Sequence, residues 1–210
     1  MDKKSLIVNT FKDISEITND RFVTLRNYDL IPHASSMEND IDLLILPIFL
    51  KELIDKLKPY GYNIYQDSNR CLYGAQPHIH MKHNALDVHF DITLGLYYRS
   101  IADNTAFVNI DDKLLRMMIK NRVTTSSVFK NTPHPNDEIV HLICHCIFDK
   151  QKTTERYESQ IIKLLDIIDH DQVKSRLDLI FYKAADTIFN KVINADVKDL
   201  FNTYITFKDY

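Results

Sequence analysis

Apolar and polar positions in the N-terminal part of the chain switch between helical and extended spacing. Over residues 5–18 apolar side chains recur every three or four positions, which predicts an amphipathic helix. Residues 22–25 and 40–46 are short apolar runs and are predicted to be strands. The segment between them, residues 27–39, is rich in turn formers, whereas residues 47–58 begin with a proline and suit a helix.

The clearest strand pattern lies over residues 85–92, where apolar and polar side chains alternate. Successive side chains of a strand point to opposite faces, so one face of this segment is predicted to be buried. The apolar face carries Leu86, Val88, Phe90 and Ile92, and the polar face carries Asp87, His89 and Asp91. Two further short strands are predicted over residues 62–66 and 71–75.

The apolar spacing becomes helical after Asp111 and remains so almost to the end of the chain. The predicted helices cover residues 111–121, 136–149, 155–168, 170–193 and 195–206. Residues 123–135, with two prolines and several Ser and Thr, are the best linker candidate. We therefore predict an α+β protein, with a small mixed-sheet domain over residues 1–110 and a helical domain over residues 111–210.

Composition adds limits on the partners and the compartment. The 210 residues are 45% hydrophobic and 26% charged, which is ordinary usage for a globular protein. The net charge of −3 and the lack of a basic stripe argue against a nucleic-acid partner. No run reaches the roughly 18 apolar residues of a membrane span, and no signal-peptide core follows the N-terminus. The three cysteines suit a reducing compartment, so we expect a cytoplasmic protein without a membrane partner.

The scarcity of glycine narrows the choice of nucleotide-binding folds. The chain contains only three glycines, which leaves no room for a glycine-rich phosphate loop. Both the Rossmann and the P-loop sites need such a loop, because backbone N–H groups must approach the phosphates closely. The sequence therefore argues against both of these sites.

The string Asn39-Asp40-Ile41-Asp42-Leu43-Leu44-Ile45 carries the most chemical information. Two carboxylates two positions apart on a strand share one face and lie roughly 7 Å apart, while the alternating apolar residues anchor the other face. Such a pair can share a divalent cation, because Mg²⁺ is typically held by one or two carboxylates together with substrate phosphates. The alternative is an exposed strand start with two solvated aspartates.

The sequence His141-Leu142-Ile143-Cys144-His145-Cys146 raises the question of a zinc site. On a helix His141 and His145 share a face, as metal-binding pairs often do. However, Leu142 stands where a zinc protease has its glutamate, and Cys144 points away from that face. The preferred interpretation is a largely buried helix that packs toward the sheet, with His141 or His145 lining a nucleotide cleft between the two halves of the chain.

Broad apolar faces recur in the predicted helices over residues 161–168 and 177–189. Faces of this width usually pack into the core of a helical domain. The alternative interpretation is a homo-oligomer contact through the helical half.

The order of these features resembles the DNA polymerase β-like nucleotidyltransferase superfamily. In that superfamily a small or polar turn after the first strand precedes an Asp-x-Asp strand, as Leu25-Arg26-Asn27-Tyr28 precedes the 39–45 string here. The string Leu86-Asp87-Val88-His89-Phe90 is similar to an acidic-x-His strand of uncharacterised nucleotidyltransferase families. The resemblance covers residues 22–92 and is only architectural over the helical half.

This resemblance implies a metal-dependent transfer of a nucleoside monophosphate from an NTP to an unidentified small-molecule or protein acceptor. Asp40, Asp42 and Asp87 would be the catalytic residues and would hold Mg²⁺ or Mn²⁺, with Asp91 as the alternative third carboxylate. The expected nucleotide-binding residues are Arg26, Asn27, Ser35, Ser36 and His89. The first two of these stand where the superfamily usually has a glycine-serine turn.

Two other functions fit the same residues. The first is a catalytically silent nucleotidyltransferase fold that works as a binding or regulatory module, for instance as a toxin–antitoxin partner. The Arg26-Asn27 turn favours this interpretation, and the intact carboxylates argue against it. The second is transfer of another phosphorylated substrate at the same metal site.

Overall fold

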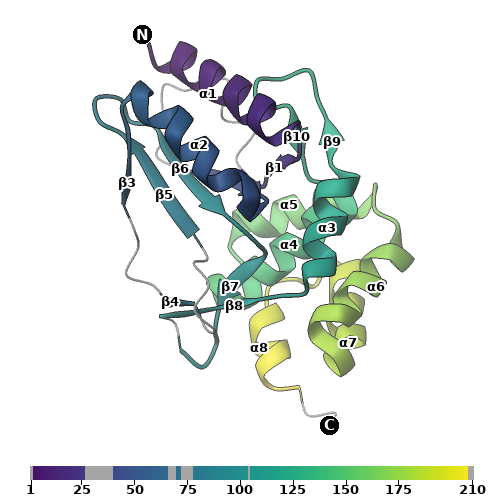
Figure 1. Ribbon diagram of the computed structural model, residues 1–210. Helices are drawn as coiled ribbons and strands as arrows, with labels where there is room; N and C mark the ends of the chain where they lie inside the picture. The colour runs from purple at the N-terminus through teal and green to yellow at the C-terminus, as the bar shows by residue number, and fades with distance from the viewer. Residues whose placement is uncertain (1, 27–39, 66–69, 72–77, 104, 208–210) are drawn as a thin grey trace.

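A mixed β-sheet forms the framework of the N-terminal half (Figure 1). The computed structural model describes residues 2–26, 40–65, 70–71, 78–103 and 105–207. Within these ranges five strands form the sheet, in the order β1 (Phe22–Thr24), β2 (Ile41–Ile45), β6 (His89–Thr93), β5 (His78–His83) and β3 (Tyr62–Tyr65). Strands β2 and β6 are parallel, and the other neighbours are antiparallel. The predicted α+β class with a mixed sheet is confirmed.

Two helices, α1 (Lys3–Thr18) and α2 (Leu50–Leu57), cover one face of this sheet (Figure 1). They enclose a buried apolar cluster with alternate residues of the central strands: Ile41, Leu43, Ile45, Ile79, Met81, Phe90 and Ile92. Pro47 begins a short 3₁₀ turn (Pro47–Phe49) that leads into α2, and its fixed φ suits that position. The apolar parity predicted for residues 85–92 is therefore correct at Phe90 and Ile92.

On the opposite face of the central strands the alternate residues are polar, except for Leu44 of β2, which is buried against the helical half. The strand register places Asp42 of β2 beside Asp91 of β6, and Asp91 beside His80 of β5. In the next row Thr93 pairs with His78. Charged and polar side chains from three strands thus share one surface of the sheet.

Strand β5 was not among the predicted strands, and β6 is shorter than the predicted strand over residues 85–92. The turn between β5 and β6 explains the later start of β6. The His83 Nδ1 accepts hydrogen bonds from the backbone N–H groups of Ala85 and Leu86, at 3.1 and 2.9 Å. Because the N–H groups of Ala85 and Leu86 are engaged in the turn, the pairing of β6 with β5 begins only at His89.

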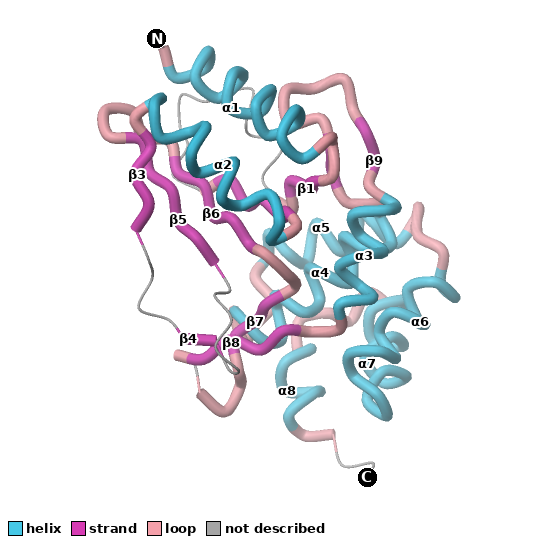
Figure 2. The backbone as a smooth tube through the Cα atoms, in the orientation of Figure 1, coloured by secondary structure: helices cyan, strands magenta, loops and turns pink. Residues whose placement is uncertain are grey.

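Smaller sheets link the two halves of the chain (Figure 2). One has the order β4 (Arg70–Cys71), β8 (Ala106–Asn109) and β7 (Tyr97–Arg99), and the other pairs β9 (Val123–Thr124) with β10 (Asn131–Thr132). The β9–β10 hairpin occupies much of the predicted linker. It packs on the first half, since the Asn131 side chain donates to the Asp20 carbonyl at 2.8 Å.

Helices dominate the second half and pack against the sheet beside β1 and β2 (Figure 1). They are α3 (Asp112–Asn121), α4 (Pro135–Cys144), α5 (Glu155–Leu165), α6 (His170–Phe181), α7 (Ala185–Ile193) and α8 (Leu200–Ile205). Their core includes Val23 and Leu44 from the sheet, so the helical half is joined to the sheet by a shared apolar cluster. None of the helices in the described ranges is both long and apolar enough to cross a membrane.

Three predicted helices depart from the expected form. The predicted helix over residues 195–206 is helical only over α8, Leu200–Ile205. The predicted helix over residues 136–149 ends as a π-helical turn over His145–Asp149. The predicted helix over residues 170–193 is broken at Tyr182, whose φ of 49° and ψ of −122° are far from helical values. Apolar spacing did not reveal the break, because Phe181, Ala184 and Ala185 on either side of it remain buried.

A buried ion pair joins α4 to α6 in the helical half. The Arg176 Nε donates to Asp137 Oδ1 at 2.6 Å, and both side chains are only 3% exposed. The Arg176 Nη1 also donates to the Gln172 carbonyl at 2.8 Å. The stability of a buried charge depends on its ion-pair partner, because water cannot reach the charge and take the partner's place.

We expect Asp137→Asn to lower the free energy of unfolding by about 3–5 kcal/mol, since it leaves the Arg176 charge buried and unpaired. The matched control is Asp196→Asn, which breaks a pair between Lys191 and an aspartate that is 60% exposed. Surface pairs contribute less, so its effect should stay below about 1 kcal/mol. Urea unfolding measures both values, and equal losses in the two variants would contradict the prediction.

Candidate functional site

Two aspartates on adjacent parallel strands form the centre of the candidate site. The register pairs Asp42 of β2 with Asp91 of β6, and strand alternation turns both side chains to the polar face. Asp42 is buried, at 7% exposure, and Asp91 is partly buried. Two carboxylates so close in a partly dry environment repel each other, so compensating donors or cations are needed.

Arg26, which follows β1, supplies the first compensation. Its Nη2 forms an ion pair with Asp42 Oδ1, and its Nε donates to Asp42 Oδ2 at 3.2 Å. This two-bond arrangement is the strong geometry for a guanidinium on a carboxylate. The antiparallel pairing of β1 with β2 places residue 26 near Asp42, since the Leu25 N–H donates to the Asp42 carbonyl at 2.9 Å.

The helical half holds the other side of this guanidinium. The Arg26 Nη1 donates to His145 Nε2 at 2.6 Å and lies 3.4 Å from the Tyr157 hydroxyl. Since His145 Nε2 accepts, the ring proton is on Nδ1, which donates to Asp149 Oδ2 at 2.7 Å. Both His145 and Asp149 belong to the π-helical turn, a feature found often at functional sites.

His78 of β5 supports the second carboxylate. Its Nδ1 lies 2.7 Å from Asp91 Oδ1, and the pair is partly buried. The His78 Nε2 is buried without a hydrogen-bond partner among the described residues, and the same holds for Nε2 of His141. Buried polar atoms without partners commonly face a water, an ion or a ligand.

A small cavity of about 40 Å³ lies between these groups. Its lining includes Arg26, Asp42, His78, Asp91, His141, His145 and Asp149. A volume of about 10–15 Å³ already holds one water, so this cavity has room for an ion or a few waters. The unpaired Nε2 atoms of the two histidines belong to residues of its wall.

The proton affinities of these groups follow from burial and from their neighbours. Burial raises the pKa of Asp42, Arg26 reverses the rise only in part, and Asp91 and Asp40 add to it. Burial would likewise raise the pKa of Asp91, but the hydrogen bond and charge of His78 outweigh it and lower the value. For His145, burial and then Arg26 lower the pKa, which agrees with a neutral ring that accepts from Arg26.

The remaining predicted carboxylates lie at the exposed end of the same face. Asp40 precedes β2, and its Oδ1 is 3.7 Å from His89 Nδ1. The His89 Nε2 lies 3.1 Å from Oδ1 of Asp87, a carboxylate that is 69% exposed. Asp87 stands four residues before Asp91, which is about 13 Å along an extended chain. The structure therefore brings Asp91 beside Asp42 and leaves Asp87 at the surface with His89.

The other predicted site residues have different outcomes. Arg26, predicted to bind the nucleotide, lies in the site, and its side chain is bonded to the Asp42 carboxylate. Asn27, Ser35 and Ser36 lie outside the described residues. The predicted packing of the His141–His145 helix against the sheet is confirmed, since both histidines line the cavity beside Asp42.

Cys144 and Cys146 are buried free thiols, and burial raises the pKa of each, that of Cys146 to about 11. Such thiols are poor metal ligands, because the thiolate is the ligating form. Across the described parts of the chain, no group of three or more His, Cys, Asp or Glu side chains is placed to hold a metal ion.

Sequence reasoning missed His78, Asp149 and Tyr157 as members of the site. The alternation of Ile79 and Met81 with His78 and His80 is a strand signal that would have placed His78 on the polar face. Asp149 and Tyr157 carry no comparable signal, because their role depends on the π turn and on helix packing.

Comparisons with known proteins do not assign this chain to a family. No protein-family model matches the chain, and no curated protein matches it either.

We expect Arg26→Gln to lower the free energy of unfolding by about 3 kcal/mol, because it leaves the adjacent carboxylates without their fixed cation. Arg21→Gln is the control, since Arg21 makes a long hydrogen bond to the Thr18 carbonyl, at 3.4 Å, and stacks on Phe49. Its loss should cost less than about 1 kcal/mol. Urea unfolding in the presence of a chelator measures both, and similar small losses would show that the Arg26–Asp42 pair contributes little.

Proposed function

We propose that this chain is a metal-dependent nucleotidyltransferase that moves a nucleoside monophosphate from an NTP to a small-molecule or protein acceptor. The observation that carries the proposal is the position of Asp42 and Asp91, in register on adjacent parallel strands. The superfamily that the sequence resembles has a third carboxylate on a strand beside its Asp-x-Asp strand. Asp91 has that position here, so we assign it the role first expected of Asp87.

The donor set suits Mg²⁺ or Mn²⁺. These hard cations prefer oxygen ligands, and Mg²⁺ usually takes one or two carboxylates while water and phosphate supply the rest. Asp42 and Asp91 would hold the ion as a pair, while Asp40 lies at the exposed end of the face beside His89. The cavity of about 40 Å³ that both aspartates line has room for such an ion. When bound, the metal would neutralise charge that develops on the transferred phosphate.

The chain's own residues would position the charges. Arg26 is held by His145 and Tyr157 at the edge of the cavity, and a guanidinium binds phosphate oxygens as readily as carboxylates. His78 fixes the direction of the Asp91 carboxylate through its Nδ1. Charge stabilisation by groups already in place is the largest contribution to catalysis in many enzymes.

A catalytically silent binding module is the second candidate, and one contact favours it. Arg26 already pairs with both oxygens of Asp42, so this carboxylate has a cation of the chain's own. In such a module the ion pair would be permanent and structural. The two candidates differ in two measurable properties. The enzyme should release pyrophosphate from an NTP and should be stabilised by a divalent cation, and the silent module should not release pyrophosphate.

The first experiment measures turnover. With each labelled NTP, Mg²⁺ or Mn²⁺ and a cell metabolite extract, the wild-type protein should release pyrophosphate. Asp42→Asn and Asp91→Asn should each lower kcat by at least about 100-fold, because each removes part of the charge stabilisation in the transition state. Asp87→Asn is the matched control and should stay within about threefold, since its carboxylate is exposed. A folded wild-type protein that releases no pyrophosphate with any NTP supports the silent module instead.

The second experiment measures metal binding without turnover. Mn²⁺ should raise the Tm of the wild-type protein, and more so with a non-hydrolysable NTP analogue, because a ligand of the folded state stabilises that state. The metal-dependent rise should disappear in Asp91→Asn and persist in Asp87→Asn. An equal rise in both variants would exclude Asp91 as a principal ligand.

A further inference from the structure

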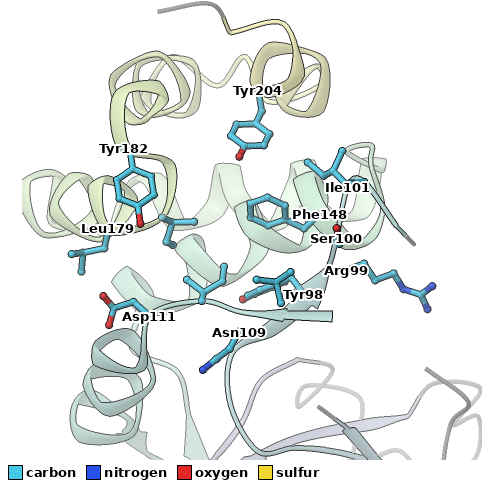
Figure 3. A pocket seen from close by; sticks show the side chains of 14 residues that line it. Tyr98, Arg99, Ser100, Ile101, Asn109, Asp111, Phe148, Leu179, Tyr182 and Tyr204 are labelled. Atoms are coloured by element: carbon cyan, nitrogen blue, oxygen red, sulfur yellow. The ribbon is translucent and has the colours of Figure 1, made fainter. Parts of the chain in front are cut away.

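A second and larger cavity, of about 570 Å³, lies between the small β4–β8–β7 sheet and the C-terminal helices (Figure 3). Its size is that of a small-molecule site. Its wall contains four aromatic side chains, Tyr98, Phe148, Tyr182 and Tyr204, together with six aliphatic ones. In Figure 3 the rings of Tyr182 and Tyr204 project from the C-terminal helices, Phe148 lies below Tyr204, and Tyr98 lies on the strand below Phe148.

Part of this aromatic wall is fixed in position. The Phe148 ring stacks on Phe181 at a centroid distance of 5.6 Å and meets the Tyr204 ring edge-on, also at 5.6 Å. Tyr98 lies 6.0 Å from Phe148, and its hydroxyl is 2.7 Å from His141 Nδ1. A wall that is already ordered loses little entropy when a ligand binds to it.

Tyr182 is the unusual member of the wall. Its φ of 49° and ψ of −122° form a backbone conformation that suits glycine and strains a bulky residue. The side chain is 76% exposed, so burial of the ring within the chain does not offset this strain. Strained residues of this kind cluster at ligand sites. The break between α6 and α7 therefore presents a large aromatic ring at the mouth of the cavity.

The charges near the cavity limit what it binds. Asp111 and Ser100 belong to its wall, and the Asp111 carboxylate also accepts the Lys113 N–H at 2.6 Å. The Arg99 guanidinium points away and lies over the Phe107 ring, 5.6 Å from its centroid. Among the described residues of the wall no cationic side chain points into the cavity, so a phosphate would meet the Asp111 carboxylate without compensation, whereas hydroxyl or amino groups would find acceptors.

The cavity adjoins the carboxylate site through shared residues. Tyr98 lines both cavities, and His141, its hydrogen-bond partner, lines the smaller one. The next residue, Arg99, donates its backbone N–H to Asp149 of the carboxylate site at 2.8 Å. A molecule in the larger cavity would therefore lie against the strand that borders Asp42 and Asp91.

We propose that this cavity is the acceptor subsite, and that the acceptor is a hydroxyl-bearing ring compound, uncharged or with an amino group. This inference rests on the proposed function. The apolar face of such a ring would stack on Tyr182 and Phe148, and its polar edge would meet Asp111, Ser100 and the phenol hydroxyls. The cavity thus favours an unphosphorylated acceptor over a second nucleotide.

Saturation-transfer NMR without NTP tests the subsite, with methyl β-glucoside, glucosamine and glucose 6-phosphate as probes. The first two should bind and the phosphate should bind most weakly. Tyr182→Gly should weaken their binding by about tenfold or more, because it removes the stacking ring. The Tm should not fall, since glycine adopts this backbone without strain. Tyr182→Phe should keep most of the binding.

The matched control is Ala195→Gly, another positive-φ position (57°), which does not line the cavity. It should leave probe binding unchanged. Unchanged binding in Tyr182→Gly, tightest binding of glucose 6-phosphate, or no binding of any probe at about 10 mM would overturn the subsite. If the protein releases pyrophosphate but binds none of the probes, only the subsite is overturned. If the probes bind in a Tyr182-dependent way but no pyrophosphate is released, only nucleotidyl transfer is contradicted.

Discussion

The ion pair between Arg26 and Asp42 is the contact through which the sheet and the helical half meet at the site. Asp42 lies on the central strand β2, while the far side of the guanidinium binds His145 and Tyr157 of the helical half. Both charges are largely withdrawn from water, so each depends on the other. The same carboxylate is the one that a metal ion would need. Any ion that binds Asp42 therefore acts on a contact that also holds the helices against the sheet.

A series of oriented hydrogen bonds makes this contact directional. Arg26 can only donate, so His145 must accept on Nε2 and present its Nδ1 proton to Asp149. The lowered pKa of His145 fits this order, because a charged ring could not accept from a guanidinium. The π-helical turn supplies both His145 and Asp149, and the Asp149 carboxylate also accepts the Arg99 N–H of β7. The turn thus connects the carboxylates to the strand between the two cavities.

Strand alternation made the core of the site predictable, whereas strand register did not follow from the sequence. The alternation of the side chains predicted that Asp87, His89 and Asp91 share the face opposite Phe90 and Ile92. In the structure Phe90 and Ile92 are buried on the apolar face, as predicted. Which aspartate stands beside Asp42 depends on how β6 is aligned with β2, and a shift of four residues separates Asp87 from Asp91. The His83-capped turn sets where β6 begins, through side-chain bonds that no periodicity reports. The break at Tyr182 was hidden for a similar reason, since apolar residues continue on both sides of it.

The walls of the two cavities differ in charge and in aromatic content, and this difference suits a different kind of ligand in each cavity. Around the smaller one, buried carboxylates, an arginine and histidines create a site in which charge must be matched. Around the larger one, aromatic and aliphatic side chains dominate, and its carboxylate Asp111 also caps α3 by accepting from the Lys113 N–H at 2.6 Å. Tyr98 belongs to both walls, with its ring among aromatic neighbours and its hydroxyl on His141. One hydrogen bond, from the Tyr98 hydroxyl to His141, therefore connects the wall of the aromatic cavity to the wall of the charged one.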